Sequence, residues 1–239
     1  MTSNMDIHLH KYQFASRVYK TLSMQLGTTI LMVLLTMIPF INNRLSVIII
    51  PLFPTMLAAV IAIILVLMYA FENMTIREIY FYLTLFNIAS GGLVAITTLI
   101  IPSEIVLGTL VGTFTIVMAL NYHATYTSYD YSRYYNYLFG LLMCVIGIFL
   151  LYLFSDLRLN TLIMGTLNAV LFSGFIVYDT QRLIAEDKEY TFKSNGHIII
   201  ALVFYIDIVY LFVMILTIVN YLASNRLKSK YKTNTYQCR

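Results

Sequence analysis

The sequence predicts an all-α membrane protein, a polytopic bundle of seven helical segments. Three observations support this prediction. Of the 239 residues, 60% are hydrophobic and only 11% are charged, whereas a soluble domain carries roughly 25% charged residues. The mean hydropathy is +0.80. Apolar runs of about 17–25 residues, long enough to cross a bilayer as helices, recur along the whole chain.

The apolar runs follow one another with short polar breaks. We expect the first four spans at residues 26–41, 46–71, 79–101 and 105–122. The second contains Pro51 and Pro54 near its start, and Pro102 separates the third from the fourth. A tyrosine-rich loop follows the fourth span. The fifth, sixth and seventh segments are expected at residues 136–154, 159–184 and 197–222. Residues 1–24 then form a cytosolic amino-terminal segment, 25–222 the bundle and 223–239 a basic tail.

Charged residues in the loops predict the orientation. Lys11, Arg17 and Lys20 precede the first span, and no small-residue cleavage site follows an apolar core there. The first span is therefore expected to be an uncleaved anchor with a cytosolic amino terminus. Two arrangements of the seventh segment stay open. Its length favours a full crossing, whereas the basic tail favours a re-entrant segment that returns the tail to the cytosol, with six spans around a central seventh.

Several classes of function are excluded by the sequence. The chain has no zinc-ligand spacing of Cys and His, no phosphate-binding loop and no serine elbow, so we expect no enzyme and no cofactor. The basic surface is too small to predict nucleic-acid binding. Cys144 lies in an apolar run and Cys238 next to the end of the chain, which is not a disulfide framework.

Two aspartates inside apolar segments are the candidate functional residues. A carboxylate in a membrane span costs several kcal/mol unless it is neutralised, paired or hydrated. Arg182 follows Asp179 by three residues and can pair with it, so an ion pair at the end of the helix is the structural alternative. Asp207 has only the Tyr210 hydroxyl as a polar neighbour on its own helix. It must find a partner on another helix, meet water or hold a proton.

If the two carboxyls meet, they titrate as a coupled pair and share one proton. Loss of this proton at higher pH would make the two charges repel, open the pair and expose oxygen ligands suited to Ca²⁺. The sequence thus suggests a pH-gated cation leak, with Asp179 and Asp207 as transient Ca²⁺ ligands. Asp207 lies about 15 Å along its segment. The pair therefore meets only if the seventh helix begins outside the membrane, where the stretch 186–189 and Asn195-Gly196 would allow it.

Three asparagines are further candidates for a pore lining or a latch, together with Arg182 and Tyr210. The three asparagines are Asn87, Asn121 and Asn168. Buried amides also join helices by hydrogen bonds, which is the structural alternative for all three.

Several stretches together resemble the Bax-inhibitor family of calcium-handling membrane proteins, also called TMBIM, lifeguard or Golgi anti-apoptotic proteins. The most specific is Gly-Phe-Ile-Val-Tyr-Asp-Thr-Gln at 174–181, which resembles the close of the family's sixth span. The stretches at 14–26, 113–126, 129–132 and 205–208 resemble its first span, its fourth span, the next loop and its seventh segment. They occur in the family's order over nearly the whole chain.

The resemblance implies a bundle of six or seven helices in the endoplasmic reticulum, Golgi or a related membrane. Members are associated with Ca²⁺ leak from stores and protection from apoptosis, and the family's pH-sensing aspartate pair maps onto Asp179 and Asp207. Expected partners are the bilayer, Ca²⁺ as the permeant ion, and host apoptosis or Ca²⁺-channel proteins. The family includes copies carried by large DNA viruses, and the Ile-, Asn- and Tyr-rich composition suits an AT-rich viral genome.

The sequence departs from the family's pattern in three places, one of which is a longer loop between the two aspartates. The second span has no internal basic residue that could latch the aspartates, and the stretch 87–92, which contains no acidic residue, stands in the region of the third span where many members carry one. Two other functions stay open. One is a non-conducting anti-apoptotic protein that acts by binding partners. The remote one is an intramembrane aspartyl protease, although Phe204-Tyr-Ile rather than Gly-x-Gly precedes Asp207.

Overall fold

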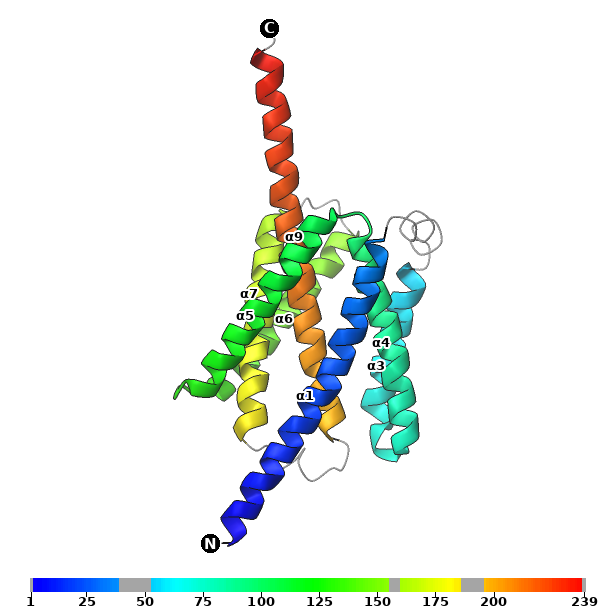
Figure 1. Ribbon diagram of the computed structural model, residues 1–239, viewed down its shortest axis with the longest axis vertical. Coiled ribbons are helices and arrows are strands. Elements are labelled where there is room, and N and C mark those ends of the chain that lie inside the picture. The colour runs from blue at the N-terminus through cyan, green and yellow to red at the C-terminus, as the bar shows by residue number, and fades with distance from the viewer. Residues whose placement is uncertain (1, 39–52, 155–159, 186–195, 238–239) are drawn as a thin grey trace. The chain divides into compact units, whose positions relative to one another are not determined.

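The computed structural model describes residues 2–38, 53–154, 160–185 and 196–237 (Figure 1). Within these ranges the chain forms helices and no strand, which confirms the all-α prediction. The long helices are α1 (Thr2–Thr36), α3 (Phe53–Ala70), α4 (Ile76–Thr98), α5 (Ser103–Tyr126), α6 (Tyr135–Phe154), α7 (Thr161–Ala185) and α9 (Gly196–Gln237). Two short 3₁₀ helices, η2 (Phe71–Asn73) and η3 (Tyr131–Tyr134), join them.

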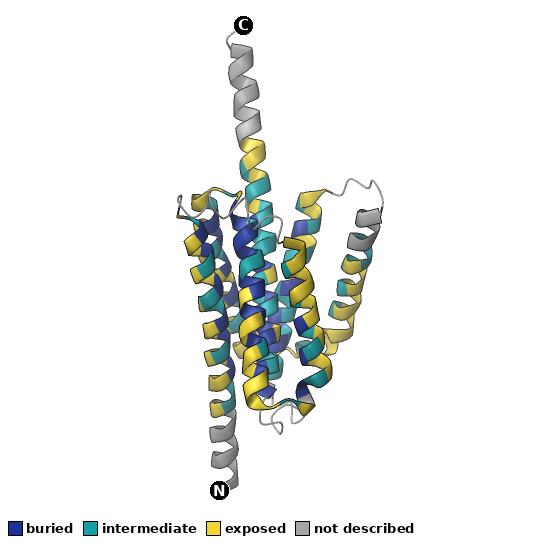
Figure 2. Ribbon diagram, turned by 90° about the vertical axis from the view of Figure 1, so that its right-hand side faces the viewer, coloured by how far each residue is buried: buried dark blue, intermediate teal, exposed yellow. Residues whose placement is uncertain are grey.

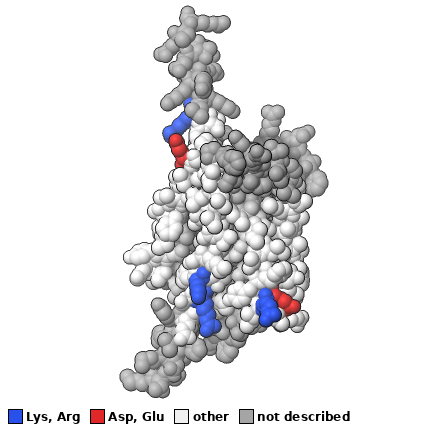
Figure 3. Space-filling model, turned by 45° about the vertical axis from the view of Figure 1, so that its right-hand side comes forward, with Lys and Arg blue, Asp and Glu red and all other residues white. Residues whose placement is uncertain are grey.

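Six of the described helices are long and apolar enough to cross a membrane, and α6 carries a shorter apolar stretch, Tyr135–Ile148. Exposed residues run along the sides of several helices (Figure 2), and many of them are large and hydrophobic, such as Phe81, Phe114 and Met118. On the face drawn in Figure 3, charged side chains are few. Apolar outer surfaces of this kind are expected where helices face lipid, and they confirm a multi-pass membrane protein.

The predicted spans match the observed helices with one substantial correction at the start. The first apolar run was expected to begin at residue 26, but α1 is already helical at Thr2 and its apolar span begins at Gln13. Arg17 and Lys20 therefore lie within this helix rather than in a preceding segment. The predicted residues 46–52 of the second span lie outside the described residues, as do those of the charged loop 186–195.

Helix α9 is one continuous helix of 42 residues. Its apolar part, Gly196–Arg226, has 31 residues, which is about 46 Å at 1.5 Å per residue and exceeds the bilayer core of about 30 Å. A re-entrant segment needs a turn within the membrane, and α9 contains none. The geometry therefore favours the full crossing over the re-entrant arrangement.

The chain divides into two compact units. The first comprises Met1–Ser103 and Lys188–Tyr205, and it contains α1, α3, α4 and the beginning of α9. Helix α4 packs against both α1 and α3. Its start is set by a capping box, in which the Thr75 side chain accepts from the Glu78 N–H and the Glu78 carboxylate accepts from the Thr75 N–H.

A tyrosine joins three helices of the first unit. The Tyr205 hydroxyl of α9 lies 2.7 Å from Thr29 Oγ1 of α1 and 2.9 Å from Ser90 Oγ of α4. Its ring meets that of Phe86 edge-on, with centroids 5.6 Å apart. Tyr205 and Phe86 are each 1% exposed. The beginning of α9 is thereby held to α1 and α4 by both packing and hydrogen bonds.

The second unit comprises Glu104–Asp187 and Ile206–Arg239, and it contains α5, α6, α7, η3 and the rest of α9. Its apolar core is a cluster from three helices: Val117, Phe172, Ile176 and Leu211. Small residues allow close approach in this unit. A Cβ at Gly165 would lie 2.9 Å from Ile218 Cγ1 of α9, so α7 and α9 pack closely there. Both candidate aspartates belong to this unit.

Candidate functional site

Asp179 of α7 and Asp207 of α9 lie together inside the second unit. Their side chains are hydrogen-bonded to each other. Asp179 is 9% exposed and Asp207 is 5% exposed. An ionised carboxylate can only accept hydrogen bonds, so this contact requires a proton on one of the two groups. Asp207 of the seventh segment thus finds its partner on another helix, α7.

The aspartates lie directly beside the apolar core because of their helical register. Ile176 precedes Asp179 by three residues on α7, and Leu211 follows Asp207 by four residues on α9. Residues three or four apart share a helix face, so the core residues and the carboxyls line the same side. The Oδ2 atoms of both aspartates are buried and have no hydrogen-bond partner among the described residues. Two charges in such an apolar surrounding would be costly.

Arg182 lies close enough to Asp179 to act on it electrostatically. It is on the same helix, three residues later, as the sequence spacing predicts. The site therefore combines two carboxyls that share one proton with one nearby guanidinium. The negative charge of the two aspartates can be reduced in two ways, by a proton on one carboxyl or by an ion pair between Asp179 and Arg182.

The residues around Asp179 in the motif each hold a different part of the second unit. The Thr180 hydroxyl donates to Asn121 Oδ1 of α5 at 2.6 Å and lies 2.7 Å from the Ile176 carbonyl. The Tyr178 ring packs on that of Tyr135 of α6, with centroids 5.1 Å apart. Asp179 is thus flanked on both sides by residues that tie α7 to neighbouring helices.

Gln181 holds the loop between α5 and η3. Its Oε1 accepts from the Tyr131 N–H at 2.8 Å, and its Nε2 donates to the Tyr129 carbonyl at 2.7 Å. One amide therefore satisfies two backbone groups that have no helical partner. In the same loop, the hydrogen bond to the Tyr134 hydroxyl raises the pKa of the Tyr129 phenol, with smaller contributions from burial and the neighbouring phenols. This loop is a connected polar cluster at the end of the motif.

The other sequence candidates lie in three different settings. Tyr210 stacks on Phe172, with centroids 4.9 Å apart, and remains 48% exposed. Asn168 donates to the Met164 carbonyl of its own helix at 2.8 Å. Asn87 belongs to the first unit, where it is buried and its Oδ1 has no partner among the described residues. Asn121 contacts the motif at 174–181 through its hydrogen bond with Thr180.

At this site the carboxyls of Asp179 and Asp207 are the groups that a cation would meet. No group of three or more His, Cys, Asp or Glu that could hold a metal occurs in the described ranges. Because Ca²⁺ takes six to eight oxygen ligands, a Ca²⁺ ion at the pair would keep most of its water. Such a site suits an ion in transit better than a tightly bound one.

Sequence reasoning missed two groups of residues. Gln181 and Thr180 stand in the motif that resembles the family, but their contacts depend on α5 and on the loop at 129–131, which local spacing does not reveal. Gln25 is a polar residue in an apolar run and is fully buried. A glutamine within an apolar run can be identified from the sequence as a candidate, because a buried amide in a span needs a hydrogen-bond partner.

Comparison with known proteins agrees with this architecture. A family model described as "Inhibitor of apoptosis-promoting Bax1" matches residues 11–226. Protein LIFEGUARD 4 of Arabidopsis thaliana is 32% identical over 143 residues, and Protein LIFEGUARD 3 of the same plant is 30% identical over 143 residues. Each match covers 58% of this chain and 56% of the relative. The matched part therefore spans little more than half the length of these relatives.

Proposed function

Because this chain belongs to the Bax-inhibitor family, whose model matches residues 11–226, we propose that it is an anti-apoptotic protein that lets Ca²⁺ leak from an intracellular store. The proposed location is the endoplasmic reticulum, the Golgi or a related membrane, with the amino terminus in the cytosol. The observation that supports the leak is the hydrogen-bonded, buried pair Asp179 and Asp207. Lower store Ca²⁺ would then reduce the Ca²⁺ released during apoptosis.

In the proposed mechanism, the shared proton keeps the pair closed. When the proton leaves at higher pH, two carboxylates face each other. At a separation of 4 Å and an effective dielectric constant of 20, two unit charges repel by about 4 kcal/mol. This repulsion exceeds the net worth of a typical hydrogen bond, about 1 kcal/mol. The helices α7 and α9 are then driven apart at the pair, and the freed oxygens attract Ca²⁺.

The test measures luminal Ca²⁺ in a loaded store as the cytosolic pH is varied. The variants are Asp179→Asn and Asp207→Asn. In each, the asparagine amide can donate to the remaining carboxylate without a titratable proton, so the pair stays closed. We expect the wild-type leak to rise with pH and the leak of both variants to stay low across the same range. Glu104→Gln is the matched control, since Glu104 is an exposed carboxylate of the same unit, and its leak is expected to follow the wild type.

Equal luminal Ca²⁺ in cells with wild type, with either variant and without the protein would contradict the leak. A pH response that persists in both asparagine variants would instead exclude the aspartates as the gate. Fractionation against endoplasmic reticulum and Golgi markers tests the location, and tag accessibility tests which side holds each terminus.

The description of the matched family as an inhibitor of apoptosis-promoting Bax1 favours a second candidate. The protein would then protect cells by binding partner proteins, without conducting ions. Survival assays on Asp179→Asn and Asp207→Asn separate the two. If both variants lose the leak but keep full protection, protection by binding is favoured, whereas parallel loss of leak and protection favours the channel.

A further inference from the structure

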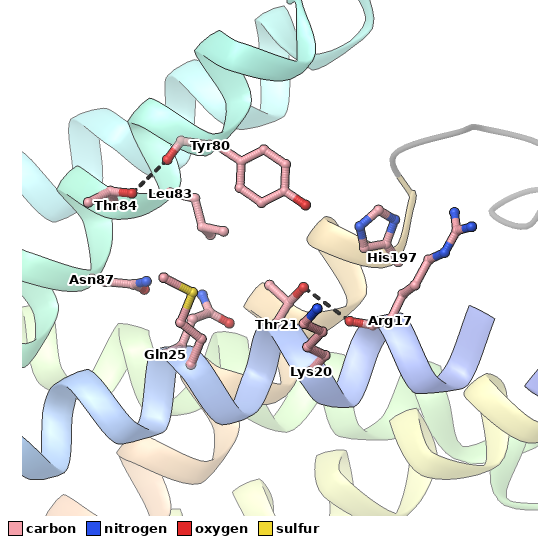
Figure 4. Close-up of a pocket in the computed structure, with 10 residues that line it drawn as sticks. Arg17, Lys20, Thr21, Gln25, Tyr80, Leu83, Thr84, Asn87 and His197 are labelled. Atoms are coloured by element: carbon pink, nitrogen blue, oxygen red, sulfur yellow. Dashed lines mark hydrogen bonds between the residues drawn. The ribbon is translucent and has the colours of Figure 1, made fainter. Parts of the chain in front are cut away.

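The first unit contains a cavity of about 610 Å³ between α1, α4 and the start of α9. Figure 4 shows its lining side chains gathered around one space. The lining includes Arg17, Lys20 and Gln25 of α1, Tyr80 and Asn87 of α4, and His197 of α9. Its volume lies within the range of about 300–1,000 Å³ that is usual for small-molecule sites. The cavity contains neither aspartate of the pair, so the following inference does not depend on the proposed leak.

The outer part of the cavity is cationic. Arg17 and Lys20 are exposed and lie about one turn apart on the same face of α1. Neither makes an ion pair within the part of the chain that the structure describes, and no acidic residue is among the lining residues there. The charge of the described lining is therefore positive, which suits an anion and not Ca²⁺.

The inner part of the cavity is lined by buried amides that have unused hydrogen-bonding capacity. Gln25 is fully buried, and neither its Oε1 nor its Nε2 has a partner among the described residues. Asn87 is 6% exposed and its Oδ1 is likewise unpartnered. Leaving a buried polar group unpaired costs about 1–3 kcal/mol. A bound hydroxyl group could donate to one of these amide oxygens and accept from the Gln25 Nε2–H, which a carbonyl group, an acceptor only, could not do.

We infer that this cavity is a binding site for a phosphate ester, either a phospholipid headgroup or a small soluble molecule. The phosphate pairs with Arg17 and Lys20, because guanidinium and ammonium groups form strong charge-assisted hydrogen bonds with phosphate oxygens. Lys20 and Gln25 are five residues apart on α1, about 7.5 Å along the helix. A ligand that reaches both parts of the cavity carries a hydroxyl group as well as a phosphate, as glycerol phosphate derivatives do.

The experiment measures binding to the purified full-length protein in a neutral detergent. The probes are inorganic phosphate, glycerol 3-phosphate and short-chain phosphatidic acid, with short-chain phosphatidylcholine as the zwitterionic comparison, whose choline cation compensates its phosphate charge. We expect saturable binding of glycerol 3-phosphate or phosphatidic acid, and weaker binding of phosphatidylcholine, because its choline cation faces Arg17 and Lys20, and of inorganic phosphate, because it cannot reach the amides. Binding of phosphatidic acid alone identifies a lipid headgroup, and binding of glycerol 3-phosphate as well identifies a soluble ligand class.

The variants test the cationic outer part and the amide-lined inner part of the cavity separately. Arg17→Gln and Lys20→Gln are expected to weaken binding of every phosphate probe by about tenfold each, and Lys20→Arg to retain it. Gln25→Leu is expected to weaken the esters but not inorganic phosphate. Since it removes an unpartnered buried amide, it should not lower the melting temperature of the free protein.

Arg77→Gln is the matched control, because Arg77 is an exposed cation of the same unit that does not line the cavity. The inference is overturned if no phosphate probe binds saturably, or if Arg77→Gln weakens binding as much as Arg17→Gln and Lys20→Gln do. The second result would show general attraction to positive charge instead of a built site.

Discussion

Replacing Tyr205 with Phe removes a single hydroxyl at the point where α9 meets α1 and α4. This hydroxyl lies 2.7 Å from Thr29 Oγ1 and 2.9 Å from Ser90 Oγ, and all three residues are buried. The phenylalanine ring can keep the edge-on contact with Phe86, so no cavity larger than a hydroxyl forms. The substitution therefore isolates the contribution of the hydrogen bonds.

The magnitude follows from what Thr29 and Ser90 can do without the phenol. Thr29 Oγ1 lies 3.2 Å from the Gln25 carbonyl, and Ser90 Oγ lies 2.7 Å from the Phe86 carbonyl. Both hydroxyls can therefore still donate within their own helices and are not stranded. The loss is one to two hydrogen bonds, each worth about 0.6–1 kcal/mol between membrane helices or in a protein interior. We expect Tyr205→Phe to cost about 0.6–2 kcal/mol.

For a chain of this size, this cost corresponds to a fall in melting temperature of about 1–8 °C. The assay is thermal unfolding of the purified protein in detergent. Tyr210→Phe is the control, because the Tyr210 ring stacks on Phe172 and its side chain is 48% exposed. If Tyr205→Phe melts at the same temperature as Tyr210→Phe, the hydroxyl does not contribute to holding α9 in the first unit, and the reasoning is refuted.

Two further substitutions test close contacts in each unit. Gln181→Leu removes the acceptor of the Tyr131 N–H. Hydrogen exchange of the Tyr131 backbone amide is therefore expected to accelerate about tenfold or more. An unchanged exchange rate would show that the loop keeps its structure without the Gln181 amide. A Cβ at Gly91 would lie 2.8 Å from Met32 Sδ and 3.5 Å from the Thr29 Cα of α1, so the further methyl groups of Gly91→Val have no room and are expected to separate α1 from α4 and abolish a monodisperse preparation. Gly108→Val meets open space at its Cβ and should purify normally; equal behaviour of the two valine variants would contradict the steric argument.

The apolar runs predicted the helices well because the bilayer imposes a simple rule. Each crossing must satisfy its backbone hydrogen bonds internally, so a long apolar run is helical whatever surrounds it. The predicted spans 136–154 and 159–184 correspond to α6, Tyr135–Phe154, and α7, Thr161–Ala185. The first span was predicted to begin at residue 26, whereas the apolar span of α1 begins at Gln13 and the helix itself at Thr2, since a helix can continue beyond its apolar part and composition does not reveal where it begins.

The candidate site was only partly accessible to the same reasoning. The cost of a carboxylate in an apolar segment identified Asp179 and Asp207 as residues that need a partner. The contact between them depends on how α9 is aligned along α7, and nothing in 27 intervening residues of sequence determines this alignment. The contacts of Gln181 with the loop at 129–131 depend in the same way on how separate segments pack.

The amino-acid sequence by itself determined the class of this protein, because the energetic cost of polar backbone and charge in lipid depends on local composition. It also identified the two aspartates, since their cost is local too. Only the tertiary structure decided that these aspartates share a hydrogen bond, that Gln25 and Asn87 face a cavity with a cationic rim, and that Tyr205 joins three helices. Each of these is a contact between residues far apart in the chain, and its geometry is set by the packing of whole helices.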